Sequence, residues 1–454
     1  MASTYLSRAT SAGNRRIATF SAWIKKSNIT AEQVYFYGNS TSPALSLYTN
    51  GDGLRLSLEN GNFLYSNNLL RDTSGWYHIV YSIDTTQATA SDRFKMYING
   101  TQVTSFLNSS YPTQNFDINM NLDSQNMYVG GIPGGANFDG SMSHVHFIDG
   151  TAYDASAFGE YDSNGVWKAK ISPSVTYGTN GFFILKDSAS VTDQSGNGNN
   201  FTVAGGTLTN TQDCPANVFA TLNALANNGS GTLAYGNTEI SASGTVNFVG
   251  TTGTLGFNKG KYYWEMKVFR PSGTLYVFPG VTCTPNLNFV SVDRNEIASY
   301  RTETQGHTYQ FSSNSAEYYY NDTTLSYPHS SFSNGDILSI AMDADNNKLY
   351  LGINGTWQNS GDPTSGATGT GAVSTISPDA TVGSYTGSGY WIPCINVYYE
   401  STTKSAHNFG NGYFGTTAVA SAQNPDDGIG IFEYDVPTGY KALCTKSINA
   451  QEYS

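Results

Sequence analysis

Residues 93–103 read RFKMYINGTQV, and residues 348–358 read KLYLGINGTWQ, so one chain carries the same short pattern twice. Each stretch alternates large apolar and polar residues and then runs into Asn-Gly. An earlier alternating stretch ending in Asp precedes each one, at 74–84 (SGWYHIVYSID) and at 334–345 (NGDILSIAMDAD). Alternation with a period of two predicts strands, and Asn-Gly accepts the positive φ of a tight hairpin. The sequence therefore predicts two β-hairpins in the same register.

The alternation also predicts which side chains of each hairpin face a core. These are Ile79, Tyr81, Ile83, Phe94, Met96 and Ile98 in the first hairpin, and Leu338, Ile340, Met342, Leu349, Leu351 and Ile353 in the second. The opposite face of the first hairpin carries His78, Val80 and Ser82. Asn99 and Asn354 are 255 positions apart (354 − 99), far beyond the period of a solenoid. We therefore expect two separate β-sandwiches built on one plan.

Composition supports a β-rich protein and excludes several classes of function. The 454 residues carry 22 Lys+Arg against 34 Asp+Glu, a net charge of −12, which argues against a nucleic-acid binder and against docking on an anionic membrane. Charged residues reach only 12%, while aromatic residues, mostly Tyr, reach 13%. Few charges with many Tyr and turn-forming residues are typical of β-proteins on extracellular or particle surfaces.

The cysteines and the N-terminal segment indicate in which cellular compartment the protein folds. Cys214, Cys283, Cys394 and Cys444 form no CxxC pair, which predicts reduced, mostly buried thiols and no metal knuckle. The first residues, MASTYLSRATSAGNRR, contain no apolar run, so no secretory signal is expected. No other stretch is apolar for long enough to span a bilayer, so membrane insertion is not expected.

Turn clusters divide the chain into short strands, and the fold class predicted is all-β with two sandwiches and an ordered connector. The first sandwich is expected at 1–155 and the connector at 156–215. The second sandwich is expected at 216–445, followed by a short C-terminal tail at 446–454.

Several motifs carry a family resemblance. GWYHIVYSID followed by RFKMYINGTQV resembles the laminin G-like, concanavalin A-like jelly roll over residues 1 to about 155. NKGKYYWEMKV (258–268), GDILSIAMDADNNKLYLGING (335–355) and YWIPCINVYY (390–399) resemble a SPRY domain. The opening YLSRATSAGNRRIATFSAWIKKSNI, the phrase SHVHFIDGTAYDASAFGEYD and PTGYKALCTK resemble bacteriophage structural proteins that join these two domains. The resemblance implies a virion component, a tail fibre or adhesin, that forms a homo-oligomer, most simply a trimer.

The carboxylates do not show the spacing of a glycan-degrading enzyme. Retaining glucanases of this fold use a Glu-x-Asp-x-x-Glu run, whose carboxyl groups lie about 5 Å apart. Glu265 stands alone, Glu296 and Glu303 lack the spacing, and Glu160 with Asp162 lies in the connector. We therefore expect no enzymatic activity and keep a glycan-degrading enzyme as the less favoured alternative.

Two short motifs contain metal-ligating residue types. His144 and His146 in SHVHF provide half a zinc site, and the alternative, which we favour, is a strand with two hydrogen-bonded imidazoles. In TDQSGNGNNF (192–201), the oxygens of Asp193, Asn197 and Asn199 are candidate calcium ligands. The favoured alternative there is a glycine-rich turn held by Asx hydrogen bonds. No cofactor is required by the sequence, and calcium is the single candidate.

The candidate recognition residues are aromatic and lie near predicted loops. Tyr318, Tyr319 and Tyr320 are consecutive, so a strand exposes at least one of them. Trp357 follows the second Asn-Gly turn, and Tyr385 lies in the glycine-rich GSYTGSGYW. Such rings stack on the apolar faces of sugars, and their alternative role is burial against a neighbouring chain.

The function predicted is a non-enzymatic virion protein that binds a host cell-surface polysaccharide and contacts other virion proteins. A surface-type composition without an export signal fits a protein assembled in the host cytoplasm and displayed on the virion surface. The alternative is a capsid-decorating, head-fibre or architectural protein without a receptor. The start of the first sandwich almost at Met1, with no separate attachment domain or shaft, favours that alternative.

Overall fold

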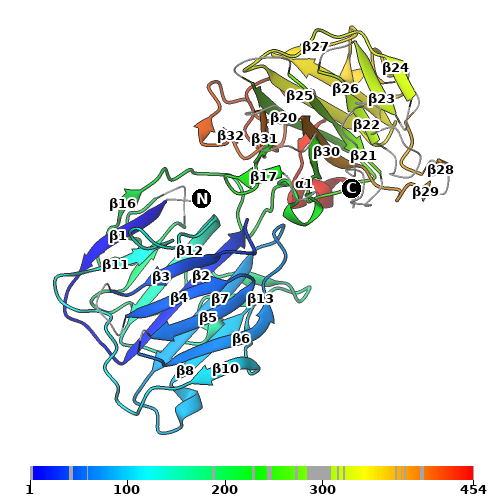
Figure 1. Cartoon of the computed structure of the whole chain (residues 1–454). Helices are drawn as coiled ribbons and strands as arrows, with labels where there is room; N and C mark the ends of the chain where they lie inside the picture. Colours follow the sequence, from blue (N-terminus) through cyan, green and yellow to red (C-terminus); the bar gives the residue numbers. More distant parts are fainter. Residues whose placement is uncertain are drawn as a thin grey trace. The chain divides into compact units, whose positions relative to one another are not determined.

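The computed structural model describes residues 4–39, 44–58, 60–186, 190–227, 231–242, 248–270, 275–283, 308–313, 316–320, 323–373, 376–379, 381–382, 385–398 and 403–452. Most described elements are strands, as Figure 1 shows. The chain forms two compact units, which comprise Met1–Asn210 with Cys214–Ala216, and Thr211–Asp213 with Asn217–Ser454. The all-β fold class predicted from the sequence is confirmed.

The first unit contains two antiparallel sheets. Its larger sheet has the order β10-β6-β5-β4-β3-β11-β1-β16, made of β1 (Tyr5–Thr10), β3 (Glu32–Tyr37), β4 (Leu45–Asn50), β5 (Gly53–Leu58), β6 (Phe63–Leu69), β10 (Phe106–Ser110), β11 (Gln125–Val129) and β16 (Thr202–Gly205). Its smaller sheet has the order β15-β12-β2-β7-β8-β9, made of β2 (Ile17–Lys26), β7 (Tyr77–Asp84), β8 (Phe94–Ile98), β9 (Thr101–Gln102), β12 (Gly140–Asp149) and β15 (Phe182–Ile184). A hairpin of β13 (Gly159–Tyr161) and β14 (Trp167–Ala169) and two short 3₁₀ turns, Ala90–Asp92 and Ala155–Ala157, complete the unit.

The core of the first unit lies between these two sheets. Phe20 of β2 contacts Phe36 of β3 with ring centroids 5.2 Å apart, and Phe36 stacks on Phe147 of β12 at 5.1 Å. Ile79 and Tyr81 are fully buried in the same cluster. The core-facing set predicted from the alternation in the first hairpin is therefore confirmed, apart from Ile98, which is half-buried.

The segment expected to be a separate connector is part of the first sandwich. Its strand β15 pairs with β12, and its strand β16 pairs with β1 at the far edge of the larger sheet. Unpaired backbone groups at a sheet edge gain partners when a later segment adds a strand. The first sandwich therefore extends to about residue 210, beyond the expected boundary at 155.

That segment also covers the outer face of the smaller sheet. Val80 is fully buried there against Phe158, with Trp167 packed beside them. Trp167 donates its indole N–H to His78 Nδ1 at 3.0 Å, so the proton of the neutral His78 ring lies on Nε2, 2.9 Å from Ser21 Oγ. Burial lowers the pKa of His78 to about 3. The face that the alternation predicts to point away from the core is therefore buried as well.

Both Asn-Gly turns have the same geometry. Asn99 and Gly100 have φ of 47° and 83°, and Asn354 and Gly355 have φ of 48° and 78°. Asn99 Oδ1 accepts the His78 backbone N–H at 2.8 Å, and Asn354 Oδ1 accepts the Ile337 N–H at 2.9 Å. The predicted tight hairpins are confirmed. In each hairpin, the asparagine side chain accepts a hydrogen bond from the start of the preceding strand.

An aromatic ring from a later segment covers the glycine of each turn. A Cβ on Gly100 would lie 2.7 Å from the Trp167 ring, and one on Gly355 would lie 2.7 Å from the Tyr434 ring. Glycine is therefore needed twice over at each turn, for the positive φ and for the space. The repeated pattern is a structural device and carries no chemistry.

The second unit is also built from two main sheets. One has the order β17-β18-β31-β20-β25-β26-β27 with β34 beside β20, made of β17 (Gly231–Ala234), β18 (Glu239–Ala242), β20 (Lys261–Phe269), β25 (Ile337–Asp343), β26 (Lys348–Ile353), β27 (Thr356–Trp357), β31 (Lys404–Asn408) and β34 (Lys441–Ala442). The other has the order β19-β30-β21-β22-β23-β24, made of β19 (Phe248–Thr252), β21 (Val277–Thr282), β22 (Thr308–Phe311), β23 (Glu317–Tyr320), β24 (Thr323–Ser326) and β30 (Ile392–Tyr398). The remaining elements among the described residues are the strand pairs β28 (Thr381–Val382) with β29 (Tyr385–Thr386) and β32 (Tyr413–Phe414) with β33 (Thr417–Ala418), two 3₁₀ turns (Ala224–Ala226, Pro363–Thr368) and helix α1 (Thr445–Glu452).

The second unit also buries both faces of its hairpin sheet. The predicted inward residues of β25 and β26 lie in the main core. A second cluster on the outer face contains Tyr263, Tyr350, Phe432 and Tyr440. The expected C-terminal tail forms most of helix α1 and belongs to this unit, because Gln451 exchanges hydrogen bonds of 2.9 and 3.0 Å with the Lys261 backbone.

The four cysteines are unpaired, as the sequence predicts. Cys283, Cys394 and Cys444 are buried, and Cys214 is half-buried. Within the described residues, no helix is long and apolar enough to cross a membrane.

Candidate functional site

The predicted tyrosine ligands fall on strands whose side chains are not described. Tyr318, Tyr319 and Tyr320 lie on β23, and Tyr385 lies on β29. Their backbones pair with neighbouring strands, and their side chains lie outside the described part of the structure. Their role in recognition stays a prediction.

Trp357 packs as a structural residue. It is half-buried, and its ring meets Tyr263 and Tyr350 edge to face with centroids 6.4 and 6.5 Å apart. It belongs to the outer cluster of the second unit, defined above by Tyr263, Tyr350, Phe432 and Tyr440. The geometry therefore favours the alternative of a packed ring over that of a ligand-stacking ring.

Asp193, the first of the predicted calcium ligands, is saturated with protein donors. Its Oδ1 accepts the backbone N–H of Phe183 and of Ser195, both at 2.9 Å. Its Oδ2 accepts the Ser195 hydroxyl at 2.8 Å and the Asn199 N–H at 2.9 Å. A carboxylate that already accepts four hydrogen bonds anchors its own loop and offers no free oxygen to a cation.

The two asparagines of this loop also form hydrogen bonds within the unit. The side-chain nitrogens of Asn197 and Asn199 both donate to the Gly181 carbonyl, at 3.0 and 2.8 Å. Asn199 Oδ1 accepts the Arg8 guanidinium at 2.6 Å, so a protein cation already neutralises this oxygen-rich corner. No group of three His, Cys, Asp or Glu side chains able to hold a metal exists in the described part of the chain. These residues do not fit a calcium ion, and the Asx-turn alternative describes the loop.

The histidines of SHVHF do not form half a metal site. His144 has a positive φ of 49° at a bulge in β12, so the two rings are not simple same-face neighbours. The His146 ring stacks on Phe183 at 3.9 Å, and its Nδ1 lies 3.0 Å from the Tyr177 hydroxyl. Burial keeps the pKa of His146 well below its usual value, so the ring is a neutral core residue.

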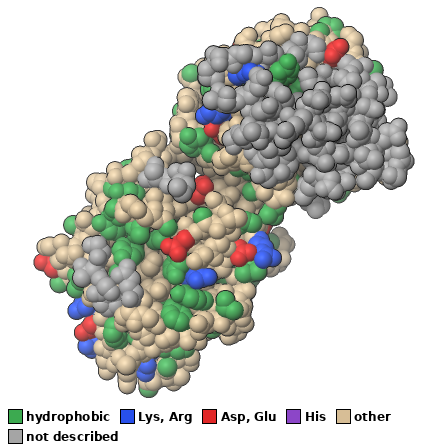
Figure 2. Space-filling view, in the orientation of Figure 1, with side chains coloured by type: hydrophobic (Ala, Val, Ile, Leu, Met, Phe, Trp, Pro, Cys, Tyr) green, Lys and Arg blue, Asp and Glu red, His purple; other side chains and the backbone are tan. Residues whose placement is uncertain are grey.

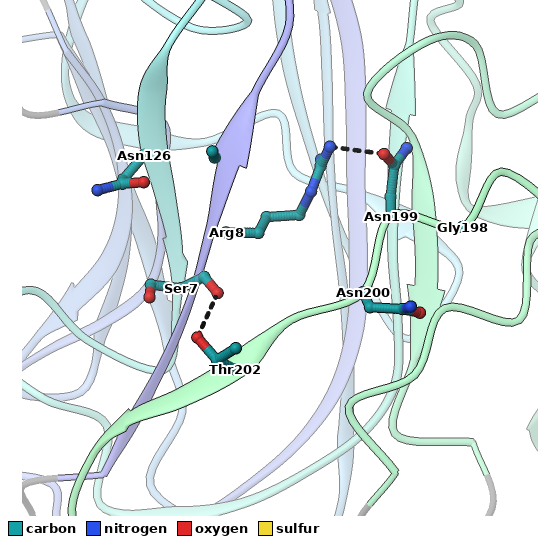
Figure 3. Close-up of a pocket in the computed structure, with 8 residues that line it drawn as sticks. Ser7, Arg8, Asn126, Gly198, Asn199, Asn200 and Thr202 are labelled. Carbon is teal, nitrogen blue, oxygen red and sulfur yellow. Dashed lines mark hydrogen bonds between the residues drawn. The ribbon is translucent and has the colours of Figure 1, made fainter.

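A polar groove opens where β1, β11, β16 and the 193–200 loop meet. Its volume is about 450 Å³, and Ser7, Arg8, Ala9, Asn126, Gly198, Asn199, Asn200 and Thr202 line it. Figure 3 shows the Arg8 side chain turned towards Asn199, while Ser7 and Thr202 meet across the two strands. Hydroxyl and amide groups of this kind match the hydrogen-bonding groups of a sugar.

Ser7 and Thr202 of this groove begin a row of residues that crosses the whole larger sheet. Neighbouring strands place in register Thr202, Ser7, Tyr128, Tyr37, Ser46, Ser57, Phe63 and Ser110. Leucines alternate with this row along β4 and β5 and face the core, so the row lies on the opposite, outward face. Eight strands spaced by about 4.8 Å give the row a length of roughly 30 Å.

A second outward set lies beside the row. Tyr48, Arg55 and Tyr65 pair in register across β4, β5 and β6. The Tyr65 ring stacks on Phe63 at 4.6 Å, and the Arg55 guanidinium lies 4.3 Å from the Tyr65 ring centroid. Burial, followed by a hydrogen bond with Tyr65, raises the pKa of the Tyr48 hydroxyl. We call these three residues together with the row the aromatic face.

The aromatic face is partly exposed and carries little charge. Its members on β4, β5 and β6 are half-buried, whereas Tyr128 is 8% exposed, with Tyr5 and Tyr37 packed beside it at 6.1 and 6.4 Å. Figure 2 shows green patches on the first unit, separated by tan surface, with blue and red side chains scattered among them. Ring faces interleaved with hydroxyls form a surface suited to sugar rings.

Sequence reasoning missed this face because each strand alone looks ordinary. LSLYTN and GLRLSL show a core face of leucines, and their polar residues are those of any solvated strand. Two signals were present, namely that most of the outward positions on β4 and β6 are Ser, Tyr or Phe and that Arg55 occupies an outward position of β5 between them. Their alignment into a row depends on the strand register, which the sequence does not give.

The comparisons with known proteins agree with this fold. A laminin G family model, described as the concanavalin A-like lectin/glucanases superfamily, matches residues 2–157. No curated protein matches the chain. The first unit thus has a laminin G-like, concanavalin A-like jelly-roll fold.

Solved structures similar to the chain include SPRY domains and a pentraxin. The SPRY domain of human HERC1 is 16% identical, with 41% of this chain and 96% of that chain covered and a TM-score of 0.28. The TRIM65 PSpry domain is 13% identical, with 42% and 91% covered and a TM-score of 0.27. A heptameric SAP-like pentraxin from Limulus polyphemus is 15% identical, with 33% and 71% covered and a TM-score of 0.25. At such values these likenesses carry no inference about a ligand.

Proposed function

We propose that this protein is a non-enzymatic virion protein, a tail-fibre-like adhesin, that binds a host cell-surface polysaccharide through the aromatic face of its first sandwich. The observation that carries the proposal is the row of aromatic and hydroxyl side chains across the larger sheet. Rings stack on the apolar faces of sugars, and flanking Ser, Thr and Asn side chains exchange hydrogen bonds with sugar hydroxyls. The site therefore differs from the loop aromatics expected from the sequence.

The dimensions of the face favour a polymer over a small ligand. A row of roughly 30 Å, at about 4.8 Å per strand, presents several shallow contacts in line. Such contacts are individually weak, and several copies of the chain on one particle would strengthen them. Homo-oligomerisation, expected as a trimer from the family resemblance, fits this requirement.

The buried carboxylates support a binding protein over a glycan-degrading enzyme. Glycosidases need two carboxyl groups facing each other across the scissile bond, about 5 to 9.5 Å apart. The buried acids among the described residues are Asp149, Asp193, Glu239, Glu265 and Asp343, and each is engaged with protein donors. Glu265, the acid singled out in the sequence, accepts the backbone N–H groups of Glu433 and Tyr434, both at 2.8 Å. It fastens that segment to β20.

The location on a virion rests on the resemblance of the N-terminal and connecting motifs to bacteriophage structural proteins. We place the protein on the virion surface, in contact with other virion proteins, after assembly in the host cytoplasm. Immunogold labelling of intact particles tests this placement. Label on the tail supports the adhesin, whereas label on the head favours the capsid-decorating alternative.

Binding of polysaccharides to the purified full-length chain tests the site. The expected result is binding that the substitution Tyr65→Ala weakens on the order of tenfold, because an aromatic anchor is removed. Tyr161→Ala is the matched control, since Tyr161 is 58% exposed on the β13–β14 hairpin, away from the larger sheet. Equal binding by both variants, or shortening of the polymer chains by the protein, would contradict the proposal.

A further inference from the structure

Arg55 is the cation on the aromatic face, and its surroundings differ from those of the other arginines of the first unit. The other five each donate to an acceptor of the protein, and they are Arg8, Arg15, Arg16, Arg71 and Arg93. The guanidinium of Arg55 has no hydrogen-bond acceptor or ion-pair partner among the described residues. Its contact is the ring of Tyr65, 4.3 Å from the guanidinium carbon.

An unpaired guanidinium held over a ring is prepared to bind an oxyanion. Stacking on Tyr65 fixes the side chain, so less conformational freedom is lost when a ligand binds. The guanidinium edge offers five N–H donors in a fork that matches carboxylate or sulfate. The stacked ring leaves that edge without competition from a protein acceptor.

The neighbours of Arg55 define the remainder of the ligand. Tyr48 and Tyr65 flank it in register on the adjacent strands, and Ser57 lies two residues along on the same strand. Glu32 lies on β3 opposite Asn50, two residue pairs beyond Tyr48 along the strand, and no ion pair with Arg55 is found among the described residues. The face thus combines one cation with rings and hydroxyls, which is more chemistry than a neutral sugar requires.

We infer that the aromatic face selects an acidic polysaccharide, with Arg55 binding a carboxylate or sulfate group of the sugar chain. This inference rests on the function proposed above and names the substrate class of the same site. The chain has a net charge of −12, so non-specific attraction of a polyanion is weak. Selectivity for an acidic polymer therefore requires a local, unpaired cation such as Arg55.

The test compares polymers that differ in their acid groups alone. Full-length protein is titrated with polygalacturonic acid, with hyaluronan, and with each polymer after chemical reduction of its carboxyl groups. The expected result is binding of the acidic forms at least tenfold tighter than their reduced forms. Arg55→Gln should weaken the affinity for the acidic forms by about 10- to 100-fold, the range for a charge-assisted hydrogen bond, and leave the affinity for the reduced forms unchanged.

Controls separate this inference from the proposed function. Arg16→Gln removes the same charge from an exposed pair with Asp117 and should bind like the unaltered chain. Equal binding of acidic and reduced polymers, with Arg55→Gln silent, overturns the acid selectivity and leaves the glycan-binding function standing. Absence of binding to all four polymers overturns both. Equally tight binding of poly-glutamate overturns the assignment to a glycan.

Discussion

The substitution Gly100→Ala tests the hairpin and the segment docked on it in one experiment. Gly100 has a φ of 83°, and an alanine there costs about 1–2 kcal/mol from the left-handed backbone alone. Its Cβ would also lie 2.7 Å from ring carbons of Trp167, closer than real Cβ atoms approach other atoms. Trp167 must therefore move.

Movement of Trp167 has a second cost. Its indole N–H donates to His78 Nδ1 at 3.0 Å, and His78 is buried. Leaving that nitrogen without a donor costs about 1–3 kcal/mol. Together with the backbone cost, Gly100→Ala should destabilise the first unit by about 2–5 kcal/mol.

Gly134→Ala is the matched control. Gly134 has a φ of 68°, and no atom lies within 4 Å of the Cβ that alanine would add. This variant should lose about 1–2 kcal/mol of unfolding free energy, the cost of the left-handed backbone alone. The difference between the variants, about 1–3 kcal/mol, corresponds to roughly 2–12 °C in Tm for a unit of this size.

The assay is urea and thermal unfolding of the full-length chain, followed by near-ultraviolet circular dichroism. A double-mutant cycle with Trp167→Ala isolates the steric part, because the added methyl group has less to displace once the ring is removed. If Gly100→Ala costs no more than Gly134→Ala, Trp167 does not dock on the hairpin. The placement of this segment in the first sandwich would then be wrong.

Three further predictions follow from buried groups. Burial raises the pKa of Glu265 to about 7, so the folded state holds this proton between about pH 4.5 and 7 while the unfolded state releases it. The contribution of Glu265 to stability is therefore full below pH 4.5 and falls by about 3 kcal/mol as the pH rises from about 4.5 to 7. Urea midpoints of Glu265→Gln should fall less steeply than those of the unaltered chain between pH 5 and 7.5, and parallel profiles would refute the assignment. Because the Asp193 carboxylate is saturated with hydrogen bonds, EDTA or added calcium should leave the Tm unchanged, and a shift of several degrees would revive the metal site. Trp357→Ala should lower the free energy of unfolding by about 2 kcal/mol, less than the loss of a fully buried ring, and should leave polysaccharide binding intact. Lost binding at an unchanged Tm would instead show that Trp357 is a ligand residue.

Local chemistry made much of the fold predictable from the sequence. Alternation with a period of two gave the core-facing residues of both hairpins, because successive side chains on a strand point to opposite faces. Asn-Gly gave the turns, since Asn99 and Gly100 accept a positive φ at low cost. The lack of a glucanase carboxylate run was also visible in the sequence, because such a run has a fixed spacing.

Contacts between distant segments decided the remainder. The sequence alone could not place Trp167 on the outer face of the first sandwich, because no residue near it in the sequence specifies His78 as its partner. Asp193 and Asn199 looked like cation ligands, because their oxygens alternate with small residues. Their actual partners, backbone N–H groups and Arg8, are brought there by the tertiary fold.

The sequence by itself determined the class of the protein: all-β, two sandwiches, each with an Asn-Gly hairpin whose turn and core face follow from neighbouring residues. The tertiary structure alone decided where the proposed binding face lies. Tyr128, Tyr37, Phe63 and Arg55 come from four strands, and one residue of slip in any of them would turn its side chain into the core. Strand register is fixed by the packing of the whole sandwich, so the aromatic face exists only after the chain has folded.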